Sequence, residues 1–319
     1  MKAAIVSQPN QSPIYGDFKT PTAAPGENSI AVTAAALSQL AKSRASGAHY
    51  TSSGEYPFVA GVDGVGRLDD GRRVYFLLPE APYGSMAEKV VIKPAQCVPL
   101  PDDLDDVTAA VIANPGMSSW AAFTERVHLA AGETVLVNGA TGTAGRLAIQ
   151  IAKHLGAGKV IATGRNLEAL KSLGALGADV TIPLETEGDG LEGALAEQFA
   201  SGVDVVIDYL WGPSAERLLI GAAKSAEGAR PIRFVQVGAI SGASINLPGA
   251  VLRSSAIELK GSGLGSVPLE RLIVAIDGVL RATIPGGFKI ATQAVPLSAL
   301  ETVWNAKGDL RRIVFVNPN

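Results

Sequence analysis

Short apolar runs interrupted by glycine and proline make up the first third of the chain. The runs are "KAAIV", "NSIAVTAAALS", "GVGRL", "RRVYFLL" and "AEKVVI". They are rich in β-branched residues, and turn-forming residues separate them. This pattern predicts an irregular, mostly antiparallel sheet or barrel.

From about Leu129 the pattern changes to strand-like apolar runs that alternate with helical stretches. The runs cover residues 134–139, 159–164, 179–183, 203–210, 232–239 and 257–263. Their nearly continuous apolar character is typical of parallel strands whose sheet is covered by helices on both faces. The middle of the chain is therefore predicted to form a doubly wound, six-stranded parallel sheet, and the predicted fold class is α/β.

Two further strand-like runs, "ATQAVPL" and "RRIVFV", follow the helical segment 269–283. They have the same character as the first third, so we expect the C-terminus to return to the first domain. The predicted β-rich domain comprises residues 1–115 and 285–319, and the predicted parallel-sheet domain comprises residues 116–284. The 319 residues are enough to bury two cores of this kind.

Composition and charge narrow the classes of partner. The chain is 47% hydrophobic and 18% charged, with a formal net charge of −3. No block of like charge would attract a nucleic-acid backbone or an anionic membrane surface, so we expect a small-molecule partner. Cys97 is the only cysteine, which rules out an internal disulfide and fits a reducing compartment. The chain shows neither a signal-like start nor an apolar run of about 18 residues, so the expected location is the cytoplasm.

A glycine-rich turn joins the first predicted parallel strand to a helix. Its spacing is Gly139-x-x-Gly142-x-x-Gly145. The first glycine permits the tight turn, the second lets the backbone approach a pyrophosphate, and the third lets the helix pack closely on the strand. The free N–H groups of the first helical turn then point at the phosphates. The predicted contacts are Gly139, Thr141, Gly142, Thr143, Ala144 and Gly145. The alternative is an ordinary glycine-rich turn that binds no nucleotide.

The second predicted parallel strand ends in Gly164-Arg165-Asn166. An NAD-specific site would place an acid there, about 20 residues beyond the glycines, to hold the ribose 2′-hydroxyl. Gly164 removes the carboxylate that would repel a 2′-phosphate, Arg165 can pair with that phosphate, and Asn166 can donate its amide. The predicted cofactor is therefore NADPH. Lys171 could add a second positive charge, although a solvated surface lysine explains it better.

Another candidate contact lies where the fifth predicted parallel strand ends. The run "VQVGAISG" puts Val237, Gly238 and Ala239 at the carboxyl edge of the sheet, where ligands of α/β folds bind. We predict that backbone groups there hold the carboxamide of the nicotinamide. Simple loop geometry is the alternative explanation of the glycine.

Several stretches in order along the chain resemble the zinc-independent quinone oxidoreductases of the medium-chain dehydrogenase/reductase superfamily. They are "MKAAIV", "IAVTAAALS", "AGVDGVGRL", "YGSMAEKVVI", "NPGMSSWAAF", "VLVNGATGTAGRLAIQIAKHLGA" and "LKSLGALGADVTI". The resemblance implies a GroES-like catalytic domain split around a Rossmann domain, with the cofactor in the cleft between them. It also places Ser119 near that cleft and implies a homodimer built by extending the Rossmann sheet edge to edge.

The same resemblance makes a metal site unexpected. Zinc-dependent members of the superfamily use a cysteine, a histidine and a further cysteine or acid as catalytic ligands. The first position falls around Ser38 and Gln39 here, and Val62 occupies the histidine position. The segment 114–119 contains no cysteine, and one cysteine cannot build the four-cysteine structural site. No metal is therefore predicted.

Without zinc to polarise a carbonyl, reduction is favoured over alcohol oxidation, because hydride transfer to a quinone or an α,β-unsaturated carbonyl needs less assistance. A hydrogen-bond donor would stabilise the charge that develops on the acceptor oxygen. Tyr50 is the predicted donor, because relatives often carry a tyrosine in this loop, and His49, Ser38 and Asn114 are further candidates. A partly exposed tyrosine without a chemical role and a helix-capping asparagine are the alternatives for Tyr50 and Asn114.

Other functions remain open at this stage. The chain could bind NADPH as a non-catalytic, crystallin-like or sensing protein, or it could be a trans-acting enoyl reductase of a synthase. A zinc-free alcohol or sugar dehydrogenase is a third alternative. The predicted function is a metal-independent, NADPH-dependent reduction of a quinone or an α,β-unsaturated carbonyl.

Overall fold

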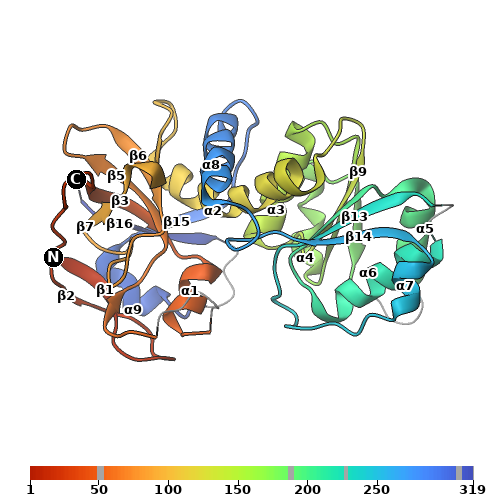
Figure 1. The fold of residues 1–319 in the computed structure, drawn as a ribbon, viewed down its shortest axis with the longest axis horizontal. Helices are drawn as coiled ribbons and strands as arrows, with labels where there is room; N and C mark the ends of the chain where they lie inside the picture. The colour runs from red at the N-terminus through yellow and green to blue at the C-terminus, as the bar shows by residue number, and fades with distance from the viewer. Residues whose placement is uncertain (49–53, 186–189, 226–228, 307–310, 319) are drawn as a thin grey trace. The chain divides into compact units, whose positions relative to one another are not determined.

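The computed structural model describes residues 1–318 except 49–53, 186–189, 226–228 and 307–310 (Figure 1). The chain divides into two compact units, which are described separately. Unit 1 comprises Met1–Asn114 and Ile276–Asn319, and unit 2 comprises Pro115–Ala275. Both junctions fall inside helices, namely α2 (Asp106–Ala121) and α8 (Leu269–Thr283). The predicted domain boundaries, which lie at nearby positions, remain predictions.

Unit 1 is β-rich and mostly antiparallel. A seven-stranded sheet has the order β15-β16-β3-β5-β6-β8 with β7 paired to β3, and a three-stranded sheet has the order β2-β1-β4. Only the β15–β16 pair within these described strands is parallel. The strands are β1 (Lys2–Val6), β2 (Ile14–Asp17), β3 (Asn28–Ala36), β4 (Phe58–Val59), β5 (Asp63–Leu68), β6 (Arg73–Leu77), β7 (Lys89–Ile92), β8 (Cys97–Pro99), β15 (Thr292–Pro296) and β16 (Arg312–Val316).

The C-terminal strands return to unit 1, as the sequence predicts. Strand β16 pairs with β3, and Phe315 packs in one core with Met86 and Trp304. Short helices border these sheets. They are α1 (Gln39–Ala45), η1 (Pro94–Gln96), η4 (Leu297–Ala299) and α9 (Leu300–Val303).

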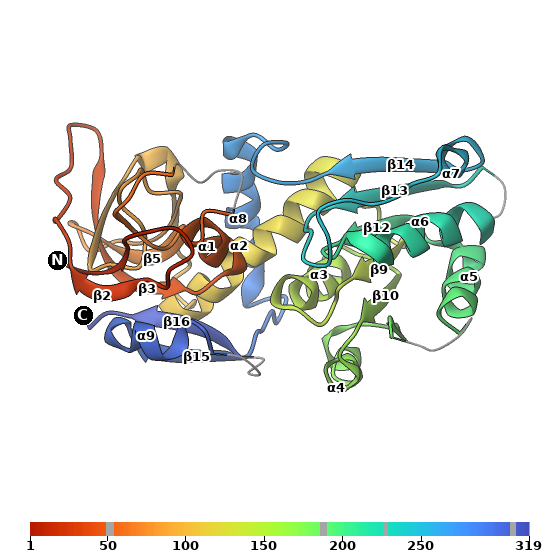
Figure 2. The same ribbon diagram turned by 90° about the horizontal axis from the view of Figure 1, so that it is seen from below.

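Unit 2 contains a six-stranded sheet in which every described pair is parallel, with the order β11-β10-β9-β12-β13-β14. The strands are β9 (Thr134–Asn138), β10 (Lys159–Gly164), β11 (Val180–Pro183), β12 (Val205–Asp208), β13 (Pro231–Gln236) and β14 (Ala256–Gly261). This is the doubly wound sheet that the sequence predicts, and the strand order reverses between β9 and β12 (Figure 2).

The helices of unit 2 alternate with these strands along the chain. They are η2 (Ala122–Val127), α3 (Thr143–His154), α4 (Leu167–Lys171), η3 (Gly174–Leu176), α5 (Gly190–Gly202), α6 (Gly212–Ser225) and α7 (Gly249–Arg253). Among the described helices of the whole chain, none is long and apolar enough to cross a membrane.

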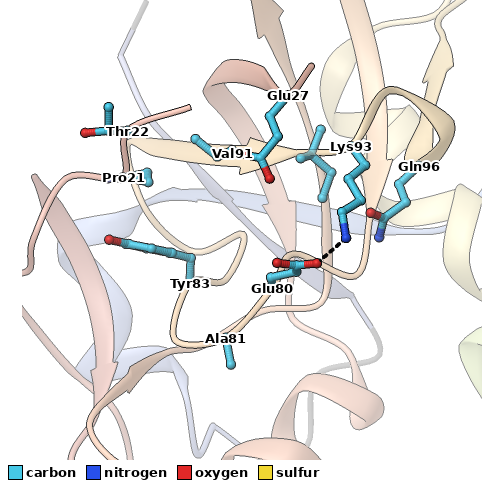
Figure 3. Close-up of a pocket in the computed structure, with 10 residues that line it drawn as sticks. Pro21, Thr22, Glu27, Glu80, Ala81, Tyr83, Val91, Lys93 and Gln96 are labelled. Atoms are coloured by element: carbon cyan, nitrogen blue, oxygen red, sulfur yellow. Dashed lines mark hydrogen bonds and ion pairs between the residues drawn. The ribbon is translucent and has the colours of Figure 1, made fainter. Parts of the chain in front are cut away.

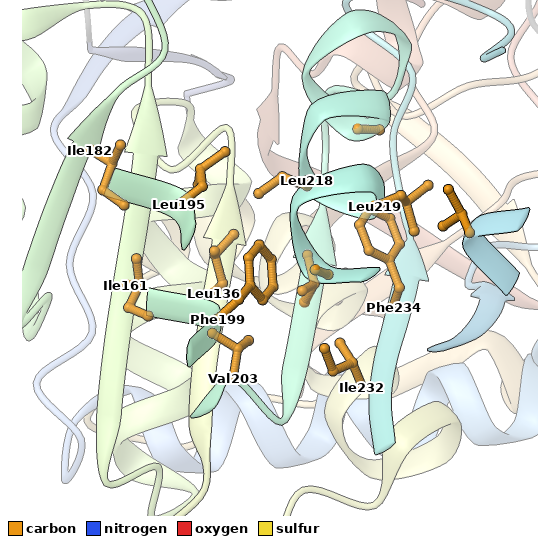
Figure 4. Packing of buried hydrophobic residues seen from close by; sticks show 14 of the residues in the cluster. Leu136, Ile161, Ile182, Leu195, Phe199, Val203, Leu218, Leu219, Ile232 and Phe234 are labelled. Atoms are coloured by element: carbon orange, nitrogen blue, oxygen red, sulfur yellow. The ribbon is translucent and has the colours of Figure 1, made fainter. Parts of the chain in front are cut away.

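The sheet is buried on both faces, which explains why its strands are apolar throughout. Leu136, Val206 and Phe234 pack in one core with residues of α5 and α6 (Figure 4). The neighbouring strand residues Val135 and Val137 point to the opposite face and are also fully buried. Because the six strands are parallel, their carboxyl ends meet at one edge of the sheet, and the glycine-rich turn lies there.

Candidate cofactor site

The three glycines of the turn between β9 and α3 have three different local surroundings. Gly139 has a φ of +86°, a conformation that favours glycine. A Cβ at Gly145 would lie 2.5 Å from the Gly139 carbonyl oxygen. Any other residue at position 145 would therefore push the helix away from the turn. A Cβ at Gly142 would meet only the Gly139 oxygen, at 3.8 Å, and otherwise open space. The turn thus leaves room for a ligand at Gly142 and is closely packed at Gly145.

The N-terminus of α3 presents uncapped backbone N–H groups at this turn. Gly142 is the N-cap residue, and no side chain accepts a hydrogen bond from the first helical turn among the described residues. Thr143 and Ala144 follow it directly, and both are partly exposed. Since the N-terminus of a helix attracts anions, the turn and the helix together fit a pyrophosphate.

A buried polar network connects three neighbouring strands behind the turn. The Thr163 hydroxyl donates to Asn138 Oδ1 at 2.6 Å, and Asn138 Nδ2 donates to Asp208 Oδ1 at 2.8 Å. All three residues have no exposed surface. Burial raises the pKa of the Asp208 carboxyl above its ordinary value, although hydrogen bonds from Asn138 and from the backbone oppose this effect. Sequence reasoning missed this network, whose only signal is a polar residue near the end of each apolar run.

Asp208 also determines where β12 ends. Its Oδ1 accepts hydrogen bonds from the backbone N–H of Leu210, at 2.9 Å, and of Trp211, at 3.2 Å. Trp211 then adopts a φ of +56°. The chain therefore turns away from the sheet directly after Asp208, although the apolar run predicted a strand up to residue 210.

The end of β10 carries the residues of the predicted phosphate site, which remains a prediction, and the structure gives Gly164 a further role. A Cβ at Gly164 would lie 2.5 Å from Thr141 Cγ2, so the threonine side chain already fills the space next to this glycine. Asn166 caps α4, with Oδ1 accepting the Ala169 N–H at 2.9 Å, and its amide group remains a donor. The Arg165 side chain is exposed and forms no ion pair with another described residue.

Two other cations lie near this strand end. Lys171 pairs with Glu168 at 2.7 Å on the exposed face of α4, which fits the surface interpretation. Arg146, which the sequence analysis missed, donates from Nε to the Thr141 carbonyl at 3.1 Å and from Nη2 to Ser172 Oγ at 3.2 Å. Partial burial lowers its pKa, but an arginine remains charged. Arg146 therefore places a positive charge beside the turn.

The residues that follow β13 are held against the end of β12. The backbone N–H groups of Val237 and Gly238 donate to the Asp208 carbonyl at 2.8 and 3.1 Å. A Cβ at Gly238 would lie 2.7 Å from the Tyr209 carbonyl oxygen, so close packing requires the glycine. Ala239 is exposed at the same edge. Contacts of these three residues with a nicotinamide remain a prediction, and two of their N–H groups already have partners.

The two serines on α2 differ in their surroundings. Ser119 is fully buried, and its hydroxyl donates to the Gly116 carbonyl at 3.1 Å. Ser118 is partly exposed and donates to the Pro115 carbonyl at 2.7 Å, while the Tyr209 hydroxyl lies 3.5 Å from its Oγ. The contact of Ser119 with a cofactor remains a prediction, and the more accessible of the two hydroxyls belongs to Ser118.

The predicted donors of unit 1 have other partners or fall in an undescribed segment. Tyr50 and His49 lie outside the described residues. Ser38 caps α1, because its Oγ accepts the Ala41 N–H at 2.9 Å. Asn114 lies within α2 and caps no helix, so the capping interpretation is wrong. Its Nδ2 instead donates to Asp63 Oδ1 at 2.8 Å.

The positions of zinc ligands in related dehydrogenases do not fit a metal here. Ser38 is nearly buried and uses its hydroxyl as a helix cap, and the side chain of Val62 is apolar. Among the described residues, no three His, Cys, Asp or Glu side chains lie together in a way that could hold a metal ion. His128 and His154 are exposed at helix ends.

A cavity of about 140 Å³ lies in unit 1, and both polar and apolar side chains line it (Figure 3). Glu80 and Lys93, which line it, form an ion pair, and Tyr83 also belongs to the lining. No predicted cofactor residue lines this cavity. It is therefore separate from the glycine-rich turn of unit 2, which remains the candidate cofactor site.

Comparisons with known proteins show the family to which the chain belongs. The family described as "Zinc-binding dehydrogenase" matches residues 144–277. The "Probable NADPH-dependent quinone reductase tdiC" of Emericella nidulans is 31% identical over an alignment of 366 residues, gaps included, which covers 99% of this chain and 100% of the relative.

Two solved structures have the same fold over nearly the whole chain. The quinone oxidoreductase from Thermus thermophilus, whose title also describes a complex with NADPH, has a TM-score of 0.81 and 25% identity, covering 99% of this chain and 100% of that one. A probable oxidoreductase from Mycobacterium abscessus has a TM-score of 0.78 and 28% identity, with 99% of each chain covered. The chain belongs to the quinone oxidoreductase-like group of the medium-chain dehydrogenase/reductase superfamily.

Proposed function

We propose that this protein is an NADPH-dependent oxidoreductase that transfers hydride to a quinone, with α,β-unsaturated carbonyl compounds as the alternative acceptors. The observation that carries the proposal is the turn at Gly142, where the backbone faces open space in front of an uncapped helix N-terminus. A relative described as an NADPH-dependent quinone reductase, matched over 99% of the chain, supports the choice of cofactor and acceptor.

The residues of unit 2 account for binding of the cofactor. Backbone N–H groups at the start of α3 bind the pyrophosphate, and Gly142 permits its close approach. Because the site lies at a fixed edge of a buried sheet, it requires little rearrangement when the cofactor binds. NADPH, when bound, supplies the hydride and the electrons for the reduction.

The end of β10 selects the phosphorylated cofactor. Arg165 is exposed next to Gly164, where an NAD-specific site would carry an acid, and it pairs with the 2′-phosphate. The Asn166 amide donates to the same phosphate while its oxygen caps α4. Arg146 adds a positive charge beside Thr141, whose side chain packs against Gly164.

The reaction proceeds without a metal. The superfamily positions of the zinc ligands hold Ser38 and Val62, which leaves no group to polarise an alcohol or a carbonyl. A quinone needs less polarisation than a simple carbonyl compound, and a hydrogen-bond donor suffices to stabilise the charge on its oxygen. Tyr50 is the proposed donor on the basis of its position in the sequence.

A panel of acceptors tests the proposed function. Consumption of NADPH is followed by absorbance with small quinones, α,β-unsaturated ketones, aldehydes and acyl-carrier-bound enoyl groups, and oxidation of alcohols is followed with NADP⁺. We expect turnover of quinones or free enones. Turnover of acyl-carrier substrates alone would indicate an enoyl reductase, oxidation of alcohols alone would indicate a dehydrogenase, and tight binding of NADPH without turnover would indicate a non-catalytic role.

We also propose a homodimer formed through β14. This strand is at the end of the described sheet and pairs only with β13 there, so its other edge is open. Leu259 on β14 and Leu252 on α7 are 39% and 46% exposed. Pairing two copies of β14 would satisfy the open backbone groups and cover these side chains. Sedimentation analysis of the wild-type protein and of Leu259→Lys tests this, with the variant expected to shift toward monomer.

The reducing cytoplasm is the proposed location. The single cysteine, Cys97, is a free thiol that is partly buried, and burial raises its pKa. An NADPH-dependent enzyme also needs the cytoplasmic pool of reduced cofactor. Fractionation of cells that express the protein tests the location, and recovery in a membrane or secreted fraction would contradict it.

A further inference from the structure

The hydroxyl groups of Tyr209 and Ser118 meet in unit 2 at the carboxyl edge of the sheet. Tyr209 is the first residue after β12, and Ser118 lies on α2. The two oxygens are 3.5 Å apart. Neither residue belongs to the glycine-rich turn or to the predicted phosphate site.

The phenol has hydrogen-bonding capacity that its described partners do not use fully. Ser118 Oγ already donates to the Pro115 carbonyl at 2.7 Å and lies 3.5 Å from the Tyr209 hydroxyl, a long contact in which either oxygen can be the donor. Burial raises the pKa of Tyr209 to about 12, although the hydroxyls of Ser118 and Ser119 oppose this effect. The phenol is therefore neutral at pH 7 and can both donate and accept. Tyr209 is partly exposed and its contact with Ser118 is long, so its hydroxyl can take a further hydrogen-bond partner.

Tyr209 lies next to the turn, on the side opposite the phosphate-selecting strand end. A Cβ at Gly139 would lie 3.4 Å from Tyr209 Cβ. Dinucleotides lie across the point where the strand order reverses, which is between β9 and β12 here. Since the adenosine ribose belongs at the end of β10, the other half of the cofactor belongs over β12 and β13. Tyr209, which directly follows β12, lies at this part of the sheet edge.

The backbone at Tyr209 is fixed without a ligand. Its N–H donates to the Asn138 carbonyl at 3.0 Å, and its carbonyl packs against Gly238. The preceding Asp208 is held by Asn138, as described above. The hydroxyl is thus presented from a rigid edge, which limits the entropy lost when a ligand binds.

We infer that the Tyr209 hydroxyl, supported by Ser118, hydrogen-bonds the nicotinamide riboside half of NADPH. The ribose hydroxyls and the carboxamide of that half are the groups that a neutral phenol can bind. This inference rests on the proposed function, because it requires that the chain binds NADPH.

The test compares two ligands that share the adenosine half. Dissociation constants of NADPH and of 2′-phospho-ADP-ribose, which lacks the nicotinamide, are measured by calorimetry for the wild-type protein and for Tyr209→Phe. We expect the variant to bind NADPH about 2- to 12-fold more weakly, the range for one neutral hydrogen bond. Its affinity for 2′-phospho-ADP-ribose should stay within about 2-fold of wild type. Tyr15→Phe, in unit 1, is the matched control and should change neither constant.

Each outcome separates the inference from the proposed function. Unchanged binding of NADPH by Tyr209→Phe overturns the inference, and so does equal weakening of both ligands, which would show a structural role. If the wild-type protein binds neither ligand, the proposed function itself fails. If the wild-type protein binds NADPH and the variant loses affinity for NADPH alone, both statements stand.

Discussion

Asn138 donates its side-chain amide to the carboxylate of Asp208 across 2.8 Å, which joins β9 to β12 at the point where the strand order reverses. The same carboxylate holds the backbone of Leu210, and so it fixes the turn that carries Tyr209. This single buried contact therefore connects the stability of the sheet to the geometry of the candidate cofactor site.

Removing the carboxylate should destabilise the protein. Asp208→Ala leaves the N–H of Leu210 without its buried acceptor and the Asn138 amide with Ser214 Oγ alone, which we expect to lower the free energy of unfolding by about 2–4 kcal/mol. Denaturant unfolding measures this value. Asp277→Ala, on the surface of α8, is the control and should leave the unfolding midpoint nearly unchanged. A loss no larger than that of the control would show that the network contributes little.

The stability should also depend on the protonation of Asp208. Burial raises the pKa of its carboxyl, so the folded protein binds this proton more tightly than the unfolded chain does. The resulting stabilisation is present at low pH and is lost as the pH rises from the unfolded-state pKa, about 3.9, through the raised folded-state pKa. The free energy of unfolding of the wild type minus that of Asp208→Asn should therefore fall as the pH rises through that window and then level off. A difference that rises with pH would contradict this assignment.

The glycine-rich turn provides a test of the pyrophosphate site. Gly142→Val should leave the fold intact, because the backbone has φ of −77° and ψ of 167°, which any residue can adopt. Its side chain would fill the space in front of α3, so the affinity for NADPH should fall by roughly 100-fold or more. Gly193→Val, on α5 with equally open surroundings, should keep wild-type affinity. Near-normal binding by a folded Gly142→Val protein would show that the phosphates bind elsewhere.

The sequence predicts the strands and the turn because their signals are local. Glycine spacing directly after an apolar run identifies the turn, and uninterrupted apolar runs identify buried parallel strands. The Thr163–Asn138–Asp208 network is different, because its contacts join residues 25 and 70 positions apart. No local pattern reveals which polar residue at one strand end meets which at another.

Side-chain roles were also harder to predict than backbone roles. The sequence predicts that Gly164 keeps a carboxylate away from a 2′-phosphate, and the structure adds that Thr141 packs against it. The sequence makes Asn114 a candidate donor, but in the structure its amide donates to the buried Asp63 carboxylate on β5. Such roles depend on which residues the tertiary fold brings together.

The proposed metal independence gives a prediction about chelators. With Ser38 and Val62 at the superfamily's ligand positions, the purified protein should hold no stoichiometric zinc, and its reductase activity should be unchanged by a chelator. Elemental analysis and an assay after dialysis against chelator test this. About one zinc per chain, with activity lost on its removal and restored on its return, would refute the prediction.

The affinity for NADPH and NADH, before and after Arg165→Ala, tests the central claim most directly. The exposed guanidinium forms no ion pair with another described residue, so a charged hydrogen bond to the 2′-phosphate should contribute roughly 1.5–3 kcal/mol. We predict that the wild-type protein prefers NADPH and that the variant binds it about 10- to 150-fold more weakly, with NADH nearly unaffected. Lys171→Ala, which removes a lysine paired with Glu168, should change neither affinity. Equal affinity of the wild-type protein for both cofactors, or equal weakening of both by Arg165→Ala, would contradict the account.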